Sequence, residues 1–264
     1  MIFLVFFLGI CVGSFLNVLI DRLPKNKTVV LGRSRCDYCR HKLAWYDLIP
    51  LLSFFFLGQK CRYCRKKLSW QYPIVEFMTG IVFAFIGYTN KAYLYSSTPG
   101  EPFQVTPGVS LVYLFVIVSG LLVIFFTDLK YRIIPDQILF ILLVTTLPYL
   151  LIYSQSLFIH HLISAVLMLL LFLLLVIITR GRGMGLGDVK YAFLMGLILG
   201  FPKIIIAFYL AFLTGACISL ILVMGGKKTI KSTIPFGPFL VLATFICLFY
   251  GERLWEIFKK VIGI

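Results

Sequence analysis

The sequence predicts an all-α polytopic membrane protein, with about eight transmembrane helices and a small cytoplasmic loop that carries cysteine knuckles. The first observation is composition: 61% of the 264 residues are hydrophobic, only 13% are charged, and the mean hydropathy is +1.01. Soluble domains are far less apolar than this. The second observation is that the apolar residues form long runs, and the third is that four cysteines lie in pairs within one polar segment.

Eight apolar runs are expected to cross the membrane as helices, because most are close to the roughly 20 residues that span a bilayer. The run that follows Asp188 is the shortest, and its thirteen residues rise only about 20 Å. Either the bilayer thins there or Asp188 lies in a recess below the membrane surface. The runs are Ile2–Ile20, Pro73–Thr89, Val109–Thr127, Asp136–Tyr153, His160–Thr179, Val189–Phe201, Ile204–Met224 and Phe236–Gly251.

The runs divide the chain into three expected parts. Residues 1–20 form the first transmembrane helix, residues 21–72 the cytoplasmic cysteine loop, and residues 73–264 the membrane-embedded helices that contain the intramembrane acids. In the first helix, Gly9 and Gly13 form a pair of small residues four apart, which predicts close packing against a neighbouring helix.

The basic residues predict the orientation of the chain. If the amino terminus is outside, twenty of the 25 lysine and arginine residues fall on inner segments and five on outer ones. Such an excess is typical of cytoplasmic loops. Because this rule accounts for most of the net charge of +15, and the basic loops contain no recognisable nucleic-acid-binding module, no nucleic-acid partner is expected.

Two acidic residues border hydrocarbon, where a carboxylate is costly and marks a functional candidate. Asp128 ends an apolar run, Asp188 begins another, and the predicted topology brings both to the cytoplasmic face at similar depth. Two neighbouring carboxyl groups, one ionised and one protonated, can activate water against a peptide carbonyl. Two structural alternatives stay open: Asp188 as a helix N-cap, and Asp128 paired with Arg132 one turn on.

The segment before Asp188 contains alternating glycines, including Gly185 and Gly187, and a helix is not expected until after Asp188. Asp136 follows a proline at the start of a run, which favours an N-cap. Lys190 is expected to favour ionisation of the acidic pair. We expect Gly185, Gly187, Lys190 and Asp136 to line the recess around the candidate site.

The four paired cysteines predict a metal site. Cys36 and Cys39 form one C-x2-C pair, Cys61 and Cys64 form a second, and 21 residues separate the pairs. This spacing suits a structural zinc ion held by four thiolates. Disulfides are the alternative, although a loop in the cytoplasm faces a reducing compartment.

Taken together, these segments resemble the prepilin peptidases, the type IV leader peptidase group of GxGD-type intramembrane aspartyl proteases. The resemblance places the family's catalytic aspartates on Asp128 and Asp188, whereas Asp136 matches the family's Pro-Asp without belonging to the catalytic pair. It runs through nearly the whole chain and rests on GSFLNVLIDRLP, LAWYDLIPLLSFFFLGQKC, LSWQYPIVEF, FTDLKYRIIPD, GMGLGDVK and IPFGPFL in that order.

The resemblance implies cleavage of the short basic leader from type IV prepilins and pseudopilins at the inner face of the bacterial cytoplasmic membrane. It also implies N-methylation of the new amino terminus with S-adenosylmethionine, although the sequence contains no glycine-rich fingerprint for that ligand. Two other classes of protein remain as alternatives: an ion-coupled membrane transporter and a non-catalytic pilus or secretion assembly factor. A transporter predicts inverted repeats, and the two halves of this chain show no convincing correspondence.

Overall fold

The computed structural model describes residues 2–29, 34–36, 38–95, 107–181, 183–226 and 234–262. Helices dominate these residues, which contain no β-strand and only two isolated bridges between residues. The chain divides into two compact units, Met1–Val123 and Ile124–Ile264. Five of the twenty basic residues counted on inner segments lie outside the described part of the chain: Arg33, Arg182, Lys227, Lys228 and Lys231.

Seven of the described helices are long and apolar enough to cross a membrane, so the predicted class is confirmed. The remaining predicted span, Val189–Phe201, corresponds to α7 (Leu186–Leu199), which has only 14 residues. The other seven are α1 (Ile2–Arg22), α3 (Gln71–Tyr95), α4 (Pro107–Tyr131), α5 (Asp136–Tyr153), α6 (Gln155–Ile178), α8 (Lys203–Met224) and α9 (Gly237–Ile262).

In the first unit α1 packs along α3, and small residues set the distance between the two helices. A Cβ atom on Gly13 would lie 2.7 Å from the Cα atom of Glu76, and one on Gly9 would lie 2.8 Å from the Cα atom of Gly80. Neither position has room for a larger side chain. The close packing predicted for Gly9 and Gly13 is therefore confirmed.

The segment between α1 and α3 contains three short helical pieces: η1 (Leu23–Lys25), η2 (Trp45–Leu48) and α2 (Leu52–Phe56). A buried carboxylate connects this loop to α3. The Oε2 atom of Glu76 accepts a hydrogen bond of 2.8 Å from the backbone N–H of Leu51. Leu51 has a positive φ of 59°, so the contact holds a backbone turn that a leucine rarely adopts.

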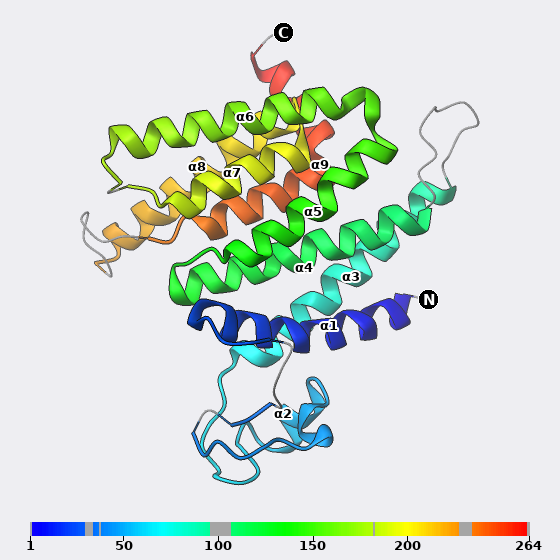
Figure 1. Cartoon of the computed structure of the whole chain (residues 1–264), viewed down its shortest axis with the longest axis vertical. Helices are drawn as coiled ribbons and strands as arrows, with labels where there is room; N and C mark the ends of the chain where they lie inside the picture. Colours follow the sequence, from blue (N-terminus) through cyan, green and yellow to red (C-terminus); the bar gives the residue numbers. More distant parts are fainter. Residues whose placement is uncertain are drawn as a thin grey trace. The chain divides into compact units, whose positions relative to one another are not determined.

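In the second unit the short helix α7 is the centre of the packing. It contacts α5, α6, α8 and α9, as Figure 1 shows for this unit. A Cβ atom on Gly196 would lie 2.6 Å from the Cα atom of Ala165, which brings α7 very close to α6. Most of α7 after Asp188 is buried, so this short helix is covered by the neighbouring helices of the unit.

Candidate functional site

Asp128 is buried near the carboxyl end of α4, and the helix continues beyond it to Tyr131. Its Oδ2 atom accepts a hydrogen bond of 2.9 Å from the backbone N–H of Gly237, the first residue of α9. A Cβ atom on Gly237 would lie 2.6 Å from the same oxygen. The glycine therefore lets α9 begin directly against the carboxyl group, where the helix dipole favours negative charge.

An ion pair between Asp128 and Arg132 does not account for all the contacts of Asp128. The charge of Arg132 does act on Asp128, but the hydrogen bond goes to Gly237. The sequence prediction did not identify Gly237 as a partner of Asp128, although the motif Pro235-Phe236-Gly237-Pro238 marks a helix start with a glycine in its first turn.

Asp188 lies in the first turn of α7, and the prediction that no helix begins until after Asp188 is wrong. The helix begins at Leu186, because Gly185 takes the extended N-cap conformation with φ −87° and ψ 158°. The Oδ2 atom of Asp188 accepts a hydrogen bond of 3.0 Å from the backbone N–H of Gly185. Asp188 thus caps the helix from its third position, and the N-cap residue itself is Gly185.

The structure brings the two predicted acids together inside the second unit, where the charge of Asp128 acts on Asp188. Each carboxyl group uses one oxygen to accept a backbone N–H at a helix start. Among the described residues, no other hydrogen-bond donor reaches either group. One oxygen of each acid is therefore available to water or to a substrate.

The other predicted lining residues have different roles. Asp136 is the first residue of α5 and makes no cap hydrogen bond, so its N-cap assignment is wrong: Pro135 holds that position. Its carboxylate instead pairs with Lys190 of α7 at 2.7 Å. Both side chains are more than half exposed, so the pair adds little stability.

The two predicted glycines also differ from each other. A Cβ atom on Gly187 would lie 3.3 Å from the Cβ atom of Ile134, so Gly187 permits a close approach to the segment before α5. A Cβ atom on Gly185 would meet nothing closer than 3.8 Å. The contribution of Gly185 is therefore its backbone N–H and not its lack of a side chain.

A buried hydrogen bond connects α7 to α9 one turn beyond Asp188. The hydroxyl of Tyr191 donates to Oγ1 of Thr244 at 2.8 Å, and both residues are completely buried. Since α9 carries Gly237, this contact helps to align the helices that hold the two acids. Sequence reasoning did not identify it, because a tyrosine and a threonine in apolar runs give no signal that they pair.

The four predicted cysteines form one cluster in the first unit. Their sulfur atoms all lie within 4.8 Å of one another, and Sγ of Cys36 is 3.8 Å from Sγ of Cys64. Four sulfur atoms at about 2.3 Å from a tetrahedral zinc ion lie about 3.8 Å apart. The described cysteines are free thiols, so the disulfide alternative is not supported. The cluster fits a zinc ion.

Both knuckles close in the same way. The backbone N–H of Cys36 donates to the carbonyl of His41, and that of Cys61 donates to the carbonyl of Lys66. An arginine follows the second cysteine of each pair and has a positive φ: 57° at Arg40 and 54° at Arg65. The two halves of the site therefore repeat one backbone turn, which presents two sulfur atoms each time.

The pKa values of two thiols in the cluster shift in opposite directions. Burial raises the pKa of the Cys36 thiol, but hydrogen bonds from the backbone of Cys39 and Tyr38 and from neighbouring thiols lower it to about 7. The Lys66 backbone lowers the pKa of Cys64, whereas burial and the other three thiols raise it to about 11. The cluster favours one thiolate and opposes a second, and a bound dication would remove that opposition.

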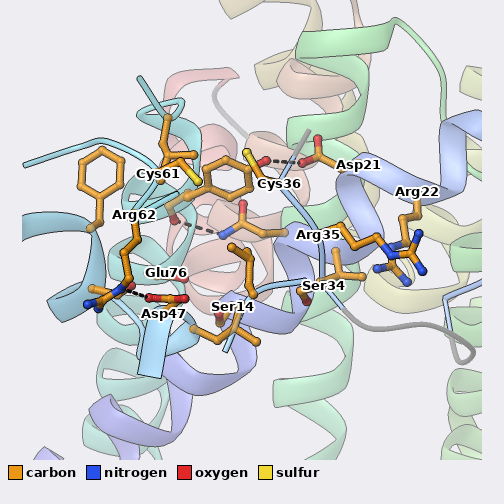
Figure 2. Close-up of a pocket in the computed structure, with 18 of the residues that line it drawn as sticks. Ser14, Asp21, Arg22, Ser34, Arg35, Cys36, Asp47, Cys61, Arg62 and Glu76 are labelled. Atoms are coloured by element: carbon orange, nitrogen blue, oxygen red, sulfur yellow. Dashed lines mark hydrogen bonds and ion pairs between the residues drawn. The ribbon is translucent and has the colours of Figure 1, made fainter. Parts of the chain in front are cut away.

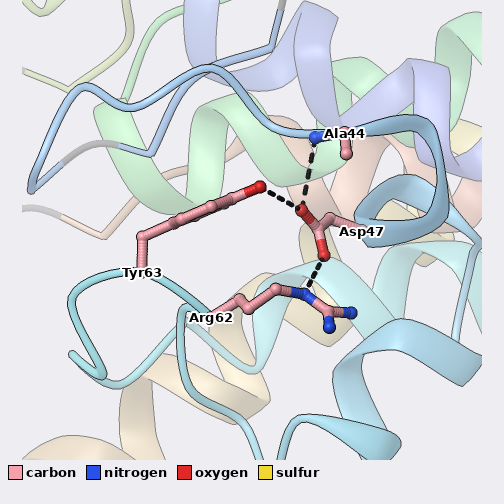
Figure 3. A network of polar contacts seen from close by, with 4 residues as sticks. All are labelled: Ala44, Asp47, Arg62 and Tyr63. Atoms are coloured by element: carbon pink, nitrogen blue, oxygen red, sulfur yellow. Dashed lines mark hydrogen bonds and ion pairs between the residues drawn. The ribbon is translucent and has the colours of Figure 1, made fainter.

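Asp47 of η2 connects the segment between the knuckles to the second knuckle (Figure 3). Its Oδ1 atom accepts a hydrogen bond of 2.7 Å from Nε of Arg62. Its Oδ2 atom accepts from the backbone N–H of Ala44 at 3.2 Å and from the hydroxyl of Tyr63 at 3.4 Å. The carboxylate thus connects two parts of the loop, the segment at Ala44 and the second knuckle.

The same unit contains a cavity of about 610 Å³ between the cysteine loop and the helices α1 and α3. Figure 2 shows Cys36 and Cys61 on its wall, with Asp47 and Arg62 on one side of the view and Arg22 on the other. The lining combines apolar side chains with polar, acidic and basic ones. The lining residues of this cavity were not predicted, because its walls come from segments far apart in the chain.

Comparisons with known proteins match most of the chain. Residues 7–90 match the model described as Bacterial Peptidase A24 N-terminal domain, and residues 115–220 match the model described as Type IV leader peptidase family. No solved structure matches the chain.

Two curated relatives match the chain almost from end to end, and a third matches about half of it. The prepilin leader peptidase/N-methyltransferase of Bacillus subtilis strain 168 is 28% identical over 99% of this chain and 99% of the relative. The protein of the same name from Pseudomonas aeruginosa is 27% identical over 97% and 92%. The one from Myxococcus xanthus is 38% identical, over 49% of this chain and 34% of its own length.

Proposed function

Because the chain belongs to the type IV leader peptidase family, we propose that it cleaves the leader from type IV prepilins and pseudopilins with Asp128 and Asp188. The observation that carries this assignment is the pair of carboxyl groups, each held at a helix start and each with one oxygen that no donor among the described residues reaches. The site lies within residues 73–264, the part of the chain to which we assign the peptidase.

In the proposed mechanism the two carboxyl groups share one proton, because two neighbouring carboxylates do not both ionise comfortably. The ionised group takes a proton from water as that water attacks the scissile carbonyl. The protonated group donates a hydrogen bond to the carbonyl oxygen, where negative charge develops. The N–H groups of Gly237 and Gly185 keep the carboxyl groups oriented, and no covalent intermediate forms.

Replacing either acid by its amide tests this assignment. We expect Asp128→Asn and Asp188→Asn each to lower cleavage of a prepilin-like peptide in detergent by about 10²-fold or more, because general acid–base catalysis contributes that much. The matched control is Glu252→Gln on α9, where an exposed carboxylate pairs with Lys203.

Normal cleavage by either aspartate variant would overturn the assignment. The same assay separates the peptidase from the two alternative classes, since neither a transporter nor an assembly factor cleaves the peptide.

For the cysteine cluster we propose a structural zinc ion bound by Cys36, Cys39, Cys61 and Cys64. The spacing of the sulfur atoms supports this metal. Four thiolates complete a tetrahedral shell and leave no position for a catalytic water. The ion would hold a loop that is too small for a sizeable core of its own.

We further propose that the chain N-methylates the new amino terminus, as the names of its relatives suggest, with S-adenosylmethionine as the donor. When bound, this donor supplies a methyl group: the amine forms a C–N bond, the C–S bond breaks with its electron pair going to sulfur, and the amine loses a proton to solvent. The mixed charges that line the cavity of the first unit fit such a ligand.

A further inference from the structure

The cysteine loop exposes large apolar side chains outside the membrane spans. Within a span such exposure faces lipid, but η2 and α2 lie in the loop between the spans α1 and α3. Trp45 at the start of η2 is 77% exposed, and Phe56 at the end of α2 is 85% exposed. Exposed apolar patches of this kind mark surfaces that bind a partner or a membrane. We call residues 45–56 the η2–α2 segment.

The exposed side chains of α2 share one face of the helix. Leu52, Phe55 and Phe56 are three and four residues apart, so they lie on the same side of one turn, and all are more than half exposed. Phe54 is buried, and its ring centroid is 5.4 Å from that of Trp70, the residue before α3. Thus α2 packs one side against the start of α3 and leaves an apolar side uncovered among the described residues.

A hydrogen bond sets the position of the η2–α2 segment along α3. Glu76 accepts from the N–H of Leu51, and it lies about 8 Å along the helix axis from Gln71, the first residue of α3. Gln71–Thr89 is long and apolar enough to span a membrane. Leu51 therefore lies at the depth where α3 enters the membrane, and Figure 1 shows α2 beside the α1–α3 pair in the first unit.

The charges around the segment suit an anionic surface. Asp47 is the only acidic residue between positions 44 and 57, and its side chain is only 3% exposed because its oxygens accept hydrogen bonds within the loop. Beyond α2, Lys60 and Lys67 are both exposed and lie opposite each other across an antiparallel bridge. Like charges directly opposite each other are destabilising, so an anion bound between them would stabilise the bridge.

We propose that the η2–α2 segment inserts its apolar side chains into the surface of the bilayer, while Lys60 and Lys67 bind the phosphate groups of anionic lipids. Aromatic side chains are enriched at the depth of the lipid headgroups, and lysines beside anionic lipids strengthen binding to the membrane. Because both ends of the loop continue into membrane spans, the bilayer is always next to the segment. The inference does not depend on the proposed peptidase or methyltransferase activity.

Fluorescence of Trp45 in lipid nanodiscs, which leave both membrane faces open to water, tests the insertion. The chain contains three tryptophans, and Trp70→Phe with Trp255→Phe leaves Trp45 as the reporter and keeps a ring at both other positions. In nanodiscs that contain phosphatidylglycerol, we expect lipids brominated in the acyl chain to quench Trp45 and iodide in the water to leave it unquenched. Quenching by iodide without quenching by bromine would overturn the proposal.

Removing the exposed rings of α2 tests which side chains hold the segment. We expect iodide to quench Trp45 when Phe55→Ser and Phe56→Ser are combined, because each buried ring contributes about ten-fold or more to the equilibrium between inserted and free segment. The matched control combines Phe3→Ser and Phe7→Ser, which removes two exposed rings from α1. Equal quenching in the two variants would contradict the role of α2, and the thermal unfolding midpoint reports whether each is folded.

Lipid composition tests the two lysines. We expect Lys60→Gln with Lys67→Gln to raise the quenching of Trp45 by iodide in phosphatidylglycerol nanodiscs, because each lysine near an anionic membrane contributes about five-fold to the binding equilibrium. In nanodiscs of phosphatidylcholine alone, this variant and the parent protein should behave alike. The same difference in both lipids, or none in either, would reject headgroup binding by the lysines.

The other possible occupants of the apolar face give different results. The basic leader of a prepilin would be repelled by Lys60 and Lys67, so we expect a prepilin-like peptide to change nothing at Trp45. If iodide quenches Trp45 until this peptide is added, the face binds the substrate. If iodide quenches Trp45 in nanodiscs with one chain but not in those with two, the face joins two copies. Either result would overturn the membrane assignment.

Discussion

Asp128 and Asp188 depend on backbone N–H groups that belong to the starts of helices. The N–H of Gly237 donates to Asp128 from a distant part of the sequence, whereas the N–H of Gly185 donates to Asp188 from three residues away. The local contact could have been derived from the spacing alone, because an acid at the third position of a helix often accepts from the N-cap residue. The distant contact could not.

Gly237→Ala tests the close approach of α9 to Asp128. The added Cβ atom would lie 2.6 Å from Oδ2 of Asp128, so the carboxyl group or the helix start must move. A displacement of about 1 Å in an active site costs on the order of 10²-fold in rate. We expect a loss of that size in leader cleavage, measured as kcat with a prepilin-like peptide.

The matched control is Gly183→Ala in the loop before α7. There the added Cβ atom meets the Thr179 side chain at an ordinary distance of 3.4 Å, and we expect near-normal cleavage. Equal activity of the two alanine variants would contradict the role that we give to Gly237.

At the scale of elements, the cysteine loop and the pair α1–α3 depend on each other. Glu76 of α3 holds the turn at Leu51, and the loop in turn covers a cavity lined by α1 and α3. The spacing of the cysteines predicted the metal ligands. It could not predict the cavity, which forms only when the loop folds against the two helices.

Removing the zinc ligands tests the element that the metal would hold. We expect one zinc ion per chain in the unmodified protein and none in a variant with Cys61→Ser and Cys64→Ser, measured by elemental analysis. Limited proteolysis should then cut within residues 34–70, because the loop has little apolar core without its metal. Protein without stoichiometric zinc, or unchanged content in the variant, would reject the tetrathiolate site.

Gly13→Val tests the packing of α1 against α3. The new side chain would start 2.7 Å from the Cα atom of Glu76, so the helices must separate. Overpacking of this kind costs about 1–3 kcal/mol. We expect a lower thermal unfolding midpoint for the purified protein.

Cys11→Val is the control for that variant, because Cys11 lies on the same helix and is exposed. Exposed positions of this kind change stability by about 0.5 kcal/mol or less. If the two valine variants unfold at the same temperature, Gly13 is not a close-packing position.

At the scale of the whole molecule, we propose that the chain lies in the bacterial cytoplasmic membrane with its amino terminus outside and its active site facing the cytoplasm. The distribution of lysine and arginine supports this orientation. The number of crossings depends on α7, since seven described helices are long enough to span and α7 has 14 residues.

Alkaline phosphatase, which is active only outside the cytoplasm, tests both points. We expect activity when it is inserted after Ser154, between α5 and α6, and none when it is inserted after Gly225, between α8 and α9. A fusion at the carboxyl terminus should be active, because eight crossings return the chain to the side of its amino terminus. The reverse pattern would overturn the orientation, and an inactive carboxyl-terminal fusion would mean that α7 does not cross.

The sequence by itself determined the membrane class, the two candidate acids and the four candidate metal ligands. Each of these depends on composition, on the length of apolar runs or on short spacings, and such patterns are local. The roles of the alternating glycines could not be predicted in the same way. The N–H of Gly185 contacts Asp188, Gly187 permits a close approach to Ile134, and the helix begins at Leu186 between them.

Only the tertiary structure decided that Gly237 binds Asp128, that Tyr191 bonds to Thr244 and that Glu76 bonds to Leu51. The physical reason is the same in each case. A buried polar group must find its partner wherever packing brings one, and packing between helices joins residues that no sequence period connects.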